Sequence, residues 1–253
     1  MIEIKSTSEI ERMRPASRVT AEILARLREM IRAGVTTGEL DREAERQIAK
    51  KGARSAFKNY RVGDVVYPKV LCVAVNDEIV HGIPSDDCEL VDGDIISLDF
   101  GVVVDGYYGD CAVTVPVGGV GEESKRLLEV TEKSLMVGIE EATPEARLGD
   151  VGAAVQETAE KAGFSVVRDF VGHGIGRALH EDPQVPNFGK RGRGRKLMPG
   201  MVLAIEPMVN MGSAAVTIDG DGWTARTVDG RRSAHFEHTV AITKDGPEIL
   251  TTA

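Results

Sequence analysis

Two aspartates lie in the most strand-like stretch of the sequence, residues 91–116. Asp105-Gly106 separates two runs rich in β-branched and aromatic residues, which predicts a β-hairpin with a two-residue turn. In the register set by that turn, Asp99 and Asp110 are diagonal neighbours on one face, within reach of a shared ion. A β-bulge would separate the two carboxylates, and both could instead face solvent. Because buried carboxylates are costly unless paired or bound to metal, the hairpin predicts a cation site.

Three further residues extend this candidate ligand set. Glu206 stands in the apolar run MVLAIEPMV, whose residues predict burial on both sides, and it is the strongest single signal. His173 lies between two glycines, and its alternative is a plain turn residue. Glu237 precedes a histidine, and its alternative is a solvated pair on an edge strand. Four carboxylates with one imidazole favour Mn, Fe, Co or Zn in an oxygen-rich site, and the absence of a thiolate argues against structural zinc.

The number of charges in this set indicates two ions rather than one. Two divalent cations about 3.5 to 4 Å apart would neutralise the carboxylates and hold a shared water between them. Metal binding lowers the pKa of water towards about 7, which supplies hydroxide at neutral pH for attack on a carbonyl or phosphoryl group. The set therefore predicts a hydrolase centre.

Two other histidines are candidates for proton transfer or substrate binding. His81 opens the sequence HGIP, and His180 follows His173 by seven positions. For each of them, a turn or surface position without a function is the alternative. The sequence lacks a G-x-S-x-G elbow, a G-x-G-x-x-G loop and the Walker spacing, which excludes these serine-hydrolase and phosphate-loop patterns.

Composition narrows the class of protein further. The chain has 253 residues, a net charge of −9 and 42% hydrophobic residues, as an ordinary acidic globular protein does, so nucleic acid is not expected as its main partner. Three cysteines without C-x-x-C spacing predict neither a disulfide framework nor a thiolate zinc site. No signal peptide or membrane span is predicted, so a cytoplasmic location is expected.

Periodicity and capping signals predict four helices and several strands. A capping box at Ser6–Glu9 opens a helix with apolar spacing up to Gly34, in which Pro15 is expected to cause a kink or a restart. A second capping box at Thr36–Glu39 opens a helix that ends near residue 51. The other predicted helices span about 122–141 and 148–161, and strand-like runs span 64–67, 70–75, 95–104, 107–117 and 164–169.

The second half of the chain repeats landmarks of the first half in the same order. The His-Gly-Ile sequence at His81, which predicts a turn, returns at His173, and Asp99 and Asp110 have counterparts in Glu206 and Glu237. An internal duplication over about residues 6–120 and 121–250 explains this order. It predicts two αβ halves with one shared core and acidic hairpins that meet at a pseudo-twofold axis, so residues 1–253 are expected to form a single domain.

A basic run covers residues 190–196, KRGRGRK. We interpret it as a solvated loop, and contact with ribosomal RNA is the alternative.

Together these motifs resemble the type I methionine aminopeptidases over about residues 9–250. The resemblance implies an α+β pita-bread fold of two related αβ halves, and removal of the initiator methionine from nascent polypeptides when the next residue is small. The motifs that carry it are His81-Gly82-Ile83-Pro84, Ser97-Leu98-Asp99 with Gly109-Asp110, GHGIG at 172–176 through His180-Glu181, Ile205-Glu206-Pro207-Met208 and Phe236-Glu237-His238-Thr239.

The resemblance also implies a role for each candidate residue. Glu206 would help to deprotonate the attacking water, His81 would contact the substrate near its amine and aid proton transfer, and His180 would hydrogen-bond the scissile amide. It further implies that two divalent metals are bound by Asp99, Asp110, His173, Glu206 and Glu237, of which Asp110 and Glu237 bridge the two ions. The residues implied around the methionine pocket are Tyr67, Cys72 and Trp223.

Two departures from the family pattern lie beside that pocket. Segment 57–67 departs from the family's usual tyrosine, glycine and second aromatic just before Pro68, of which only Tyr67-Pro68 is kept, and Leu179 stands where an aromatic residue is common. The lining of the pocket is therefore expected to be atypical.

The same motifs are compatible with other activities. An Xaa-Pro aminopeptidase or prolidase of the same fold uses a similar ligand set, but such proteins normally carry an additional N-terminal domain. A metal-free binding module would have lost the acidic positions, and a phosphoesterase would not need an apolar pocket. A monomer is expected from the acidic, unremarkable composition.

Overall fold

The computed structural model describes residues 2–253. Its first helix, α1 (Thr7–Met30), is long. Ser6 caps this helix and Glu9 completes the predicted capping box. The expectation of a restart at Pro15 was wrong, because α1 continues through it. Met13 and Ala16 on either side are fully buried, so packing holds the helix together where the proline removes one hydrogen bond.

The predicted hairpin is confirmed in its turn and in its register. Strands β6 (Ile95–Val104) and β7 (Tyr107–Pro116) are joined by Asp105 and Gly106, whose φ angles of 50° and 79° are those of the tight turns that match strand twist. Within the ladder, Asp99 is opposite Ala112 and Gly101 is opposite Asp110. Both aspartates therefore lie on the same face of the hairpin.

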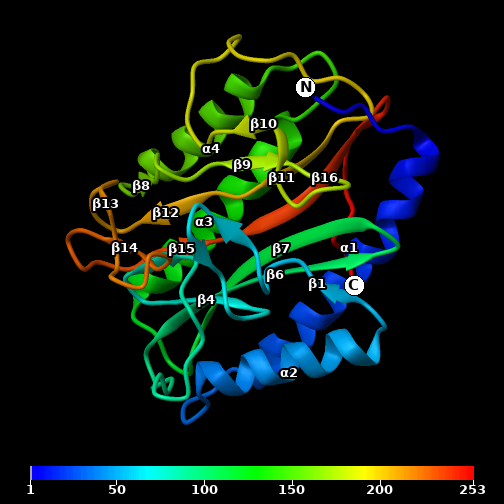
Figure 1. Ribbon diagram of the computed structural model, residues 1–253. Coiled ribbons are helices and arrows are strands. Elements are labelled where there is room, and N and C mark those ends of the chain that lie inside the picture. Colours follow the sequence, from blue (N-terminus) through cyan, green and yellow to red (C-terminus); the bar gives the residue numbers. More distant parts are fainter. Residues whose placement is uncertain (1) are drawn as a thin grey trace.

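A nine-stranded sheet forms the centre of the molecule (Figure 1). Its path runs β1-β6-β7-β16-β11-β9-β10, with β4 added on β6 and β17 on β16. The two halves of the chain meet where β7 pairs with β16, which places Glu237 opposite Ala112. Besides β6 and β7, its members are β1 (Arg54–Ser55), β4 (Cys72–Val75), β9 (Gly172–Gly174), β10 (Glu181–Val185), β11 (Val202–Ile205), β16 (Glu237–Thr243) and β17 (Gly246–Ile249).

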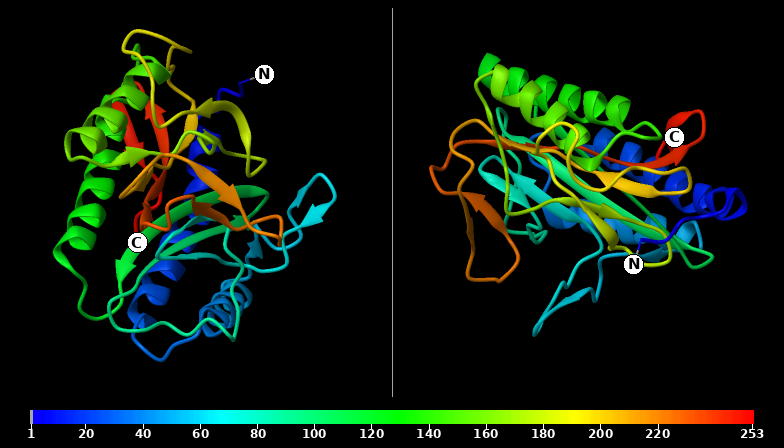
Figure 2. Two further views of the ribbon diagram at one scale, coloured as in Figure 1. Left: turned by 90° about the vertical axis from the view of Figure 1, so that its left-hand side faces the viewer. Right: turned by 90° about the horizontal axis from the view of Figure 1, so that it is seen from above.

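Two helix pairs pack on the sheet. α1 and α2 (Thr37–Lys50) share a core with the first hairpin, in which Leu27, Leu40 and Phe100 are fully buried. α3 (Glu122–Glu141) and α4 (Leu148–Lys161) share a second core with β11 and β16, around Leu127 and Leu203. In the right-hand view of Figure 2, the α3–α4 pair covers one side of the sheet, while short strands and loops project from the other. This arrangement confirms the predicted α+β class.

The shorter strands form three small sheets beside the central one. In the first sheet, β12 (Met208–Asn210) lies between β15 (Ser233–His235) and β8 (Ser165–Val166). In the second sheet, β14 (Ala225–Thr227) lies between β13 (Val216–Ile218) and β5 (Glu78–Val80). The third sheet is the hairpin of β2 (Arg61–Val62) and β3 (Val65–Val66). The strand predicted over 164–169 is therefore only two residues long. Within residues 2–253, no helix has the length and apolarity needed to cross a bilayer.

The packing of α1 on β7 predicts a large effect of one added methyl group. A Cβ on Gly109 would lie 2.7 Å from the backbone N and Cα of Ser17 in α1, and backbone atoms cannot move aside as a side chain can. We expect Gly109→Ala to lower the free energy of unfolding by about 2 kcal/mol, measured by urea denaturation. Gly119→Ala, where a Cβ meets open space, is the matched control. Equal midpoints for the two variants would contradict this prediction.

Candidate metal centre

A cavity of about 310 Å³ opens beside the junction of β7 and β16. The structure brings all ten predicted site residues to its wall: Tyr67, Cys72, His81, Asp99, Asp110, His173, His180, Glu206, Trp223 and Glu237. Leu179, noted as a departure from the family pattern, also lines it. The two halves of the chain therefore build one site.

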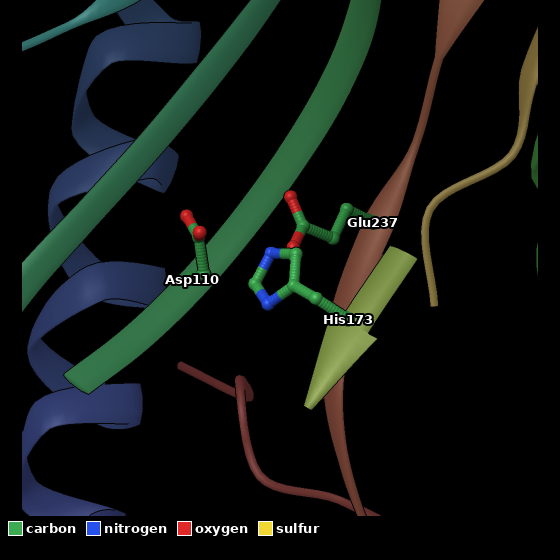
Figure 3. A group of neighbouring side chains, drawn as sticks. All are labelled: Asp110, His173 and Glu237. Carbon is green, nitrogen blue, oxygen red and sulfur yellow. The ribbon is translucent and has the colours of Figure 1, made fainter. Parts of the chain in front are cut away.

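The carboxylates converge because alternate residues of paired strands point to the same face. Asp110 on β7, His173 on β9 and Glu237 on β16 place one possible ligand atom each within 4.8 Å of one another (Figure 3). One side-chain oxygen each of Asp99, Asp110 and Glu237 is buried without a hydrogen-bond partner in residues 2–253. Buried acidic oxygens without donors are what a divalent cation would satisfy, so the residues fit a metal.

Burial disfavours the ionised form of the carboxylates in this cluster as long as no cation is bound. Burial raises the pKa of Asp99 to about 7 and that of Glu206 to about 8. Burial, with the neighbouring carboxylates adding to it, raises the pKa of Asp110 and of Glu237 well above the ordinary values. Bound cations would remove this repulsion and keep the groups ionised, and the protons would be released.

His173 is not a turn residue but part of strand β9, so the predicted His-Gly-Ile turn was wrong at this position. Its flanking glycines serve close strand packing: a Cβ on Gly172 would lie 2.3 Å from the carbonyl oxygen of Ala204, and one on Gly174 2.2 Å from that of Asp182. The Nδ1 of His173 is 2.9 Å from the carbonyl oxygen of Gly174 and donates to it, which leaves Nε2 as a metal ligand.

The same histidine reaches towards Glu206. Nε2 of His173 is 3.5 Å from Oε1 of Glu206, whose side chain is 13% exposed. Burial lowers the pKa of His173 to about 3, so the ring is neutral at physiological pH. A neutral ring with a free Nε2 is the form that binds metals.

His81 lines the cavity and has a strained backbone conformation. Its φ of 63° is in the left-handed region, which is costly for a residue with a Cβ and is concentrated at functional sites. Its ring packs edge-on against Phe170 with centroids 5.2 Å apart. Burial, and then repulsion from His235 and His180, lowers its pKa to about 4, so a neutral ring faces the cavity.

An apolar pocket adjoins the carboxylates. Tyr67 and Trp223 pack edge to face, with centroids 5.2 Å apart. The Tyr67 hydroxyl is held within 2.9 Å of the carbonyl oxygens of Leu71 and Gly82. Cys72 is opposite Asp99 in the pairing of β4 with β6, and both residues line the cavity. A pocket of aromatic rings and a sulfur atom suits a thioether side chain.

The sequence analysis missed two polar residues of the site: Tyr60, which lines the cavity, and His235, which lies next to Glu206. His235 on β15 is 1% exposed, and its Nε2 is 3.6 Å from Oε2 of Glu206. Neither ring nitrogen of His235 has a hydrogen-bond partner in the described part of the chain. Its position two residues before Glu237 was an available signal. His238 instead bonds Thr251 through Nδ1 at 2.8 Å.

The basic loop 190–196 lies outside the cavity and is largely exposed. Arg191 pairs with Glu141 and Glu157, both at 3.0 Å, and Lys196 pairs with Glu145 at 2.5 Å. Part of its charge is therefore balanced within the chain.

The chain is similar to known proteins over nearly its whole length. The model of metallopeptidase family M24 matches residues 11–244. A methionine aminopeptidase of Clostridium perfringens (strain 13 / Type A) is 53% identical over 251 residues, which are 99% of each chain. A crystal structure of methionine aminopeptidase from Thermotoga maritima has a TM-score of 0.97 and 48% identity, and each chain is covered completely.

A prolidase from Pyrococcus furiosus is structurally similar at a greater distance. It has a TM-score of 0.78 and 22% identity, and the match covers 99% of this chain but 65% of the prolidase. At this identity the similarity extends to the fold alone.

Proposed function

The chain belongs to metallopeptidase family M24, and we propose that it acts as a methionine aminopeptidase that removes the N-terminal methionine of polypeptides. The predicted pita-bread fold and type I family are confirmed by the near-complete structural match. The observation that carries the proposal is the junction of a buried, unsatisfied carboxylate cluster with an apolar pocket of Tyr67, Cys72 and Trp223.

Membership in this family implies a divalent metal cofactor, and the cluster fits one. We propose two ions, held by Asp99, Asp110, His173, Glu206 and Glu237, with Asp110 and Glu237 shared between them. Co, Mn, Fe and Zn all suit such a ligand set. When bound, these cations lower the pKa of water and polarise a carbonyl group.

The remaining residues position the substrate and move protons. Glu206 accepts a proton from the attacking water, a role that needs the ionised carboxylate which bound cations would maintain. His81 lies near the substrate amine and aids proton transfer, and His180 donates to the carbonyl oxygen of the scissile amide as charge develops. Tyr67, Cys72 and Trp223 enclose the methionine side chain.

The substrate and setting follow from the same proposal. The substrate is the N-terminus of a nascent polypeptide whose second residue is small, and the protein acts as a monomer in the cytoplasm. We interpret the loop 190–196 as a solvated loop, because Arg191 forms ion pairs within the chain. Contact with ribosomal RNA through its exposed basic side chains is the alternative.

A proline-directed peptidase is the second candidate, because the prolidase shares the fold. A non-catalytic binding module is disfavoured, since all five ligand positions retain groups that bind metal. The pocket of Tyr67 and Trp223 favours an apolar side chain at the N-terminus over recognition of a second-position proline.

Peptide cleavage distinguishes these activities. We expect the protein loaded with Mn²⁺ or Co²⁺ to release methionine from peptides that begin Met-Gly and Met-Ala, and to leave Xaa-Pro peptides intact, as measured by chromatography of the products. Chelation should abolish release, and readdition of metal should restore it. Cleavage of Xaa-Pro peptides alone would overturn the assignment.

A further inference from the structure

Tyr60 contacts His180, a proposed catalytic group, in the wall of the cavity. Its hydroxyl oxygen is 2.5 Å from Nδ1 of His180, and the two rings pack edge to face with centroids 5.1 Å apart. Both side chains line the cavity. The contact joins residues 120 positions apart in the chain, so only the folded protein has it.

The chemistry of the two groups fixes the direction of this hydrogen bond. A phenol is a better donor than a neutral imidazole N–H, and an unprotonated imidazole nitrogen is a better acceptor than a phenol oxygen. In a neutral imidazole, one ring nitrogen carries the proton and the other one accepts. The Tyr60 hydroxyl therefore donates to Nδ1, and the single ring proton is left on Nε2.

We infer that Tyr60 is a positioning residue that holds His180 in the tautomer with its proton on Nε2. With Nδ1 occupied, Nε2–H is the ring's remaining polar group, and within residues 2–253 it has no hydrogen-bond partner. It can therefore donate to a substrate carbonyl. Without the hydroxyl, the neutral ring would divide between two tautomers, and the one without a proton on Nε2 cannot donate.

The backbone around Tyr60 keeps its hydroxyl in place. Tyr60 N donates to Phe57 O at 2.8 Å, and Tyr67 N donates to Tyr60 O at 2.8 Å. Asn59 N also donates to Tyr67 O at 2.9 Å. The segment that departs from the family pattern is thus anchored at its base to Tyr67, the pocket residue, and carries the partner of His180.

Nitrogen NMR of the histidine rings tests this inference without any substrate. The chain has five histidines, so ¹⁵N-histidine labelling gives few signals, and His180→Gln identifies those of His180. In the full chain, both metal-free and loaded with diamagnetic Zn²⁺, we expect His180 to carry its proton on Nε2. In Tyr60→Phe, which keeps the ring packing, we expect averaged shifts from two tautomers.

A matched variant controls for the loss of a nearby phenol. Tyr108 lies close enough to contribute to the raised pKa of Tyr60, after burial as the larger cause. We expect Tyr108→Phe to leave the His180 signals unchanged, and unchanged signals of His235 and His238 in Tyr60→Phe will report an intact fold around the site. A wild-type proton on Nδ1, or unaltered His180 signals in Tyr60→Phe, would overturn the inference.

Kinetics provide the second readout, which rests on the proposed function. With a Met-Gly peptide, we expect Tyr60→Phe to lower kcat about tenfold and to change KM by less than about threefold, because the lost donor acts mainly in the transition state. If no methionine is released by wild type while the NMR result holds, the proposed function fails and the tautomer assignment stands. If Tyr60→Phe has normal turnover and unaltered His180 signals, the positioning role of Tyr60 is rejected and the proposed function stands.

Discussion

Glu206→Gln is expected to lower kcat for a Met-Gly peptide about 1,000-fold, since general-base groups contribute about 10²- to 10⁴-fold. Gln has the shape of the protonated carboxyl but cannot accept the proton of water. Because burial raises the pKa of Glu206 to about 8, the metal-free protein already holds much of this group neutral at pH 7. The fold should therefore survive, as checked by the thermal midpoint.

A distant carboxylate controls for the chemical change. Glu248→Gln removes one charge from an exposed ion pair with Arg14, and we expect wild-type turnover from it. Steady-state rates of both variants at saturating metal make the comparison. Turnover of Glu206→Gln within threefold of wild type would contradict the role proposed for Glu206.

The stability of the metal-free protein is expected to fall as the pH rises from about 7 to 8.5. Burial raises the pKa of Asp99 to about 7, against His235, which lowers it, and burial raises that of Glu206 to about 8, so the folded chain retains protons that the unfolded chain has released. Each retained proton costs about 1.4 kcal/mol of unfolding free energy per pH unit. The proton belongs to the coupled cluster, not to one residue.

The histidines define the lower limit of this pH window. Burial lowers the pKa of His173 to about 3 and of His238 to about 4, so these groups add stability as the pH rises towards 6.5 and oppose the carboxylates there. Above pH 7 their contribution is nearly constant, and the carboxylates determine most of the slope up to about pH 8, above which the buried thiols of Cys72 and Cys111, whose pKa burial raises, add to it.

Urea denaturation at pH 7, 7.5, 8 and 8.5 measures this slope. Excess Mn²⁺ should remove it and should stabilise the protein more at higher pH, because bound cations keep the carboxylates ionised. Glu206→Gln should make the slope of the metal-free protein shallower. A metal-free stability that rises over this range would contradict the assignment of a strained acidic cluster.

Local signals in the sequence were enough to predict the elements that carry the acidic residues. Asp105-Gly106 specified the turn, and the alternation of β6 and β7 then fixed which side chains share a face. Capping boxes at Ser6 and Thr36 placed the starts of α1 and α2. These predictions succeeded because each depends on a few neighbouring residues.

Features that depend on distant pairing were not predictable in this way. His173 looked like a turn residue, because its glycines are explained only by strands that approach from elsewhere in the chain. His235 enters the site on a three-residue strand that pairs with β12, and Tyr60 through a hairpin without the family's usual sequence. The duplication of the two halves remains a prediction from their shared order of landmarks.

The pairing of β7 with β16 has a consequence for how the chain is synthesised. The backbone N of Asp110 bonds the Thr239 hydroxyl, and that hydroxyl bonds the backbone O of Asp110, across 129 positions. A chain still emerging from its ribosome cannot assemble the centre until nearly its last strand has been released. Each copy therefore becomes competent only as a finished molecule, and the protein cannot process its own N-terminus while that strand is unmade.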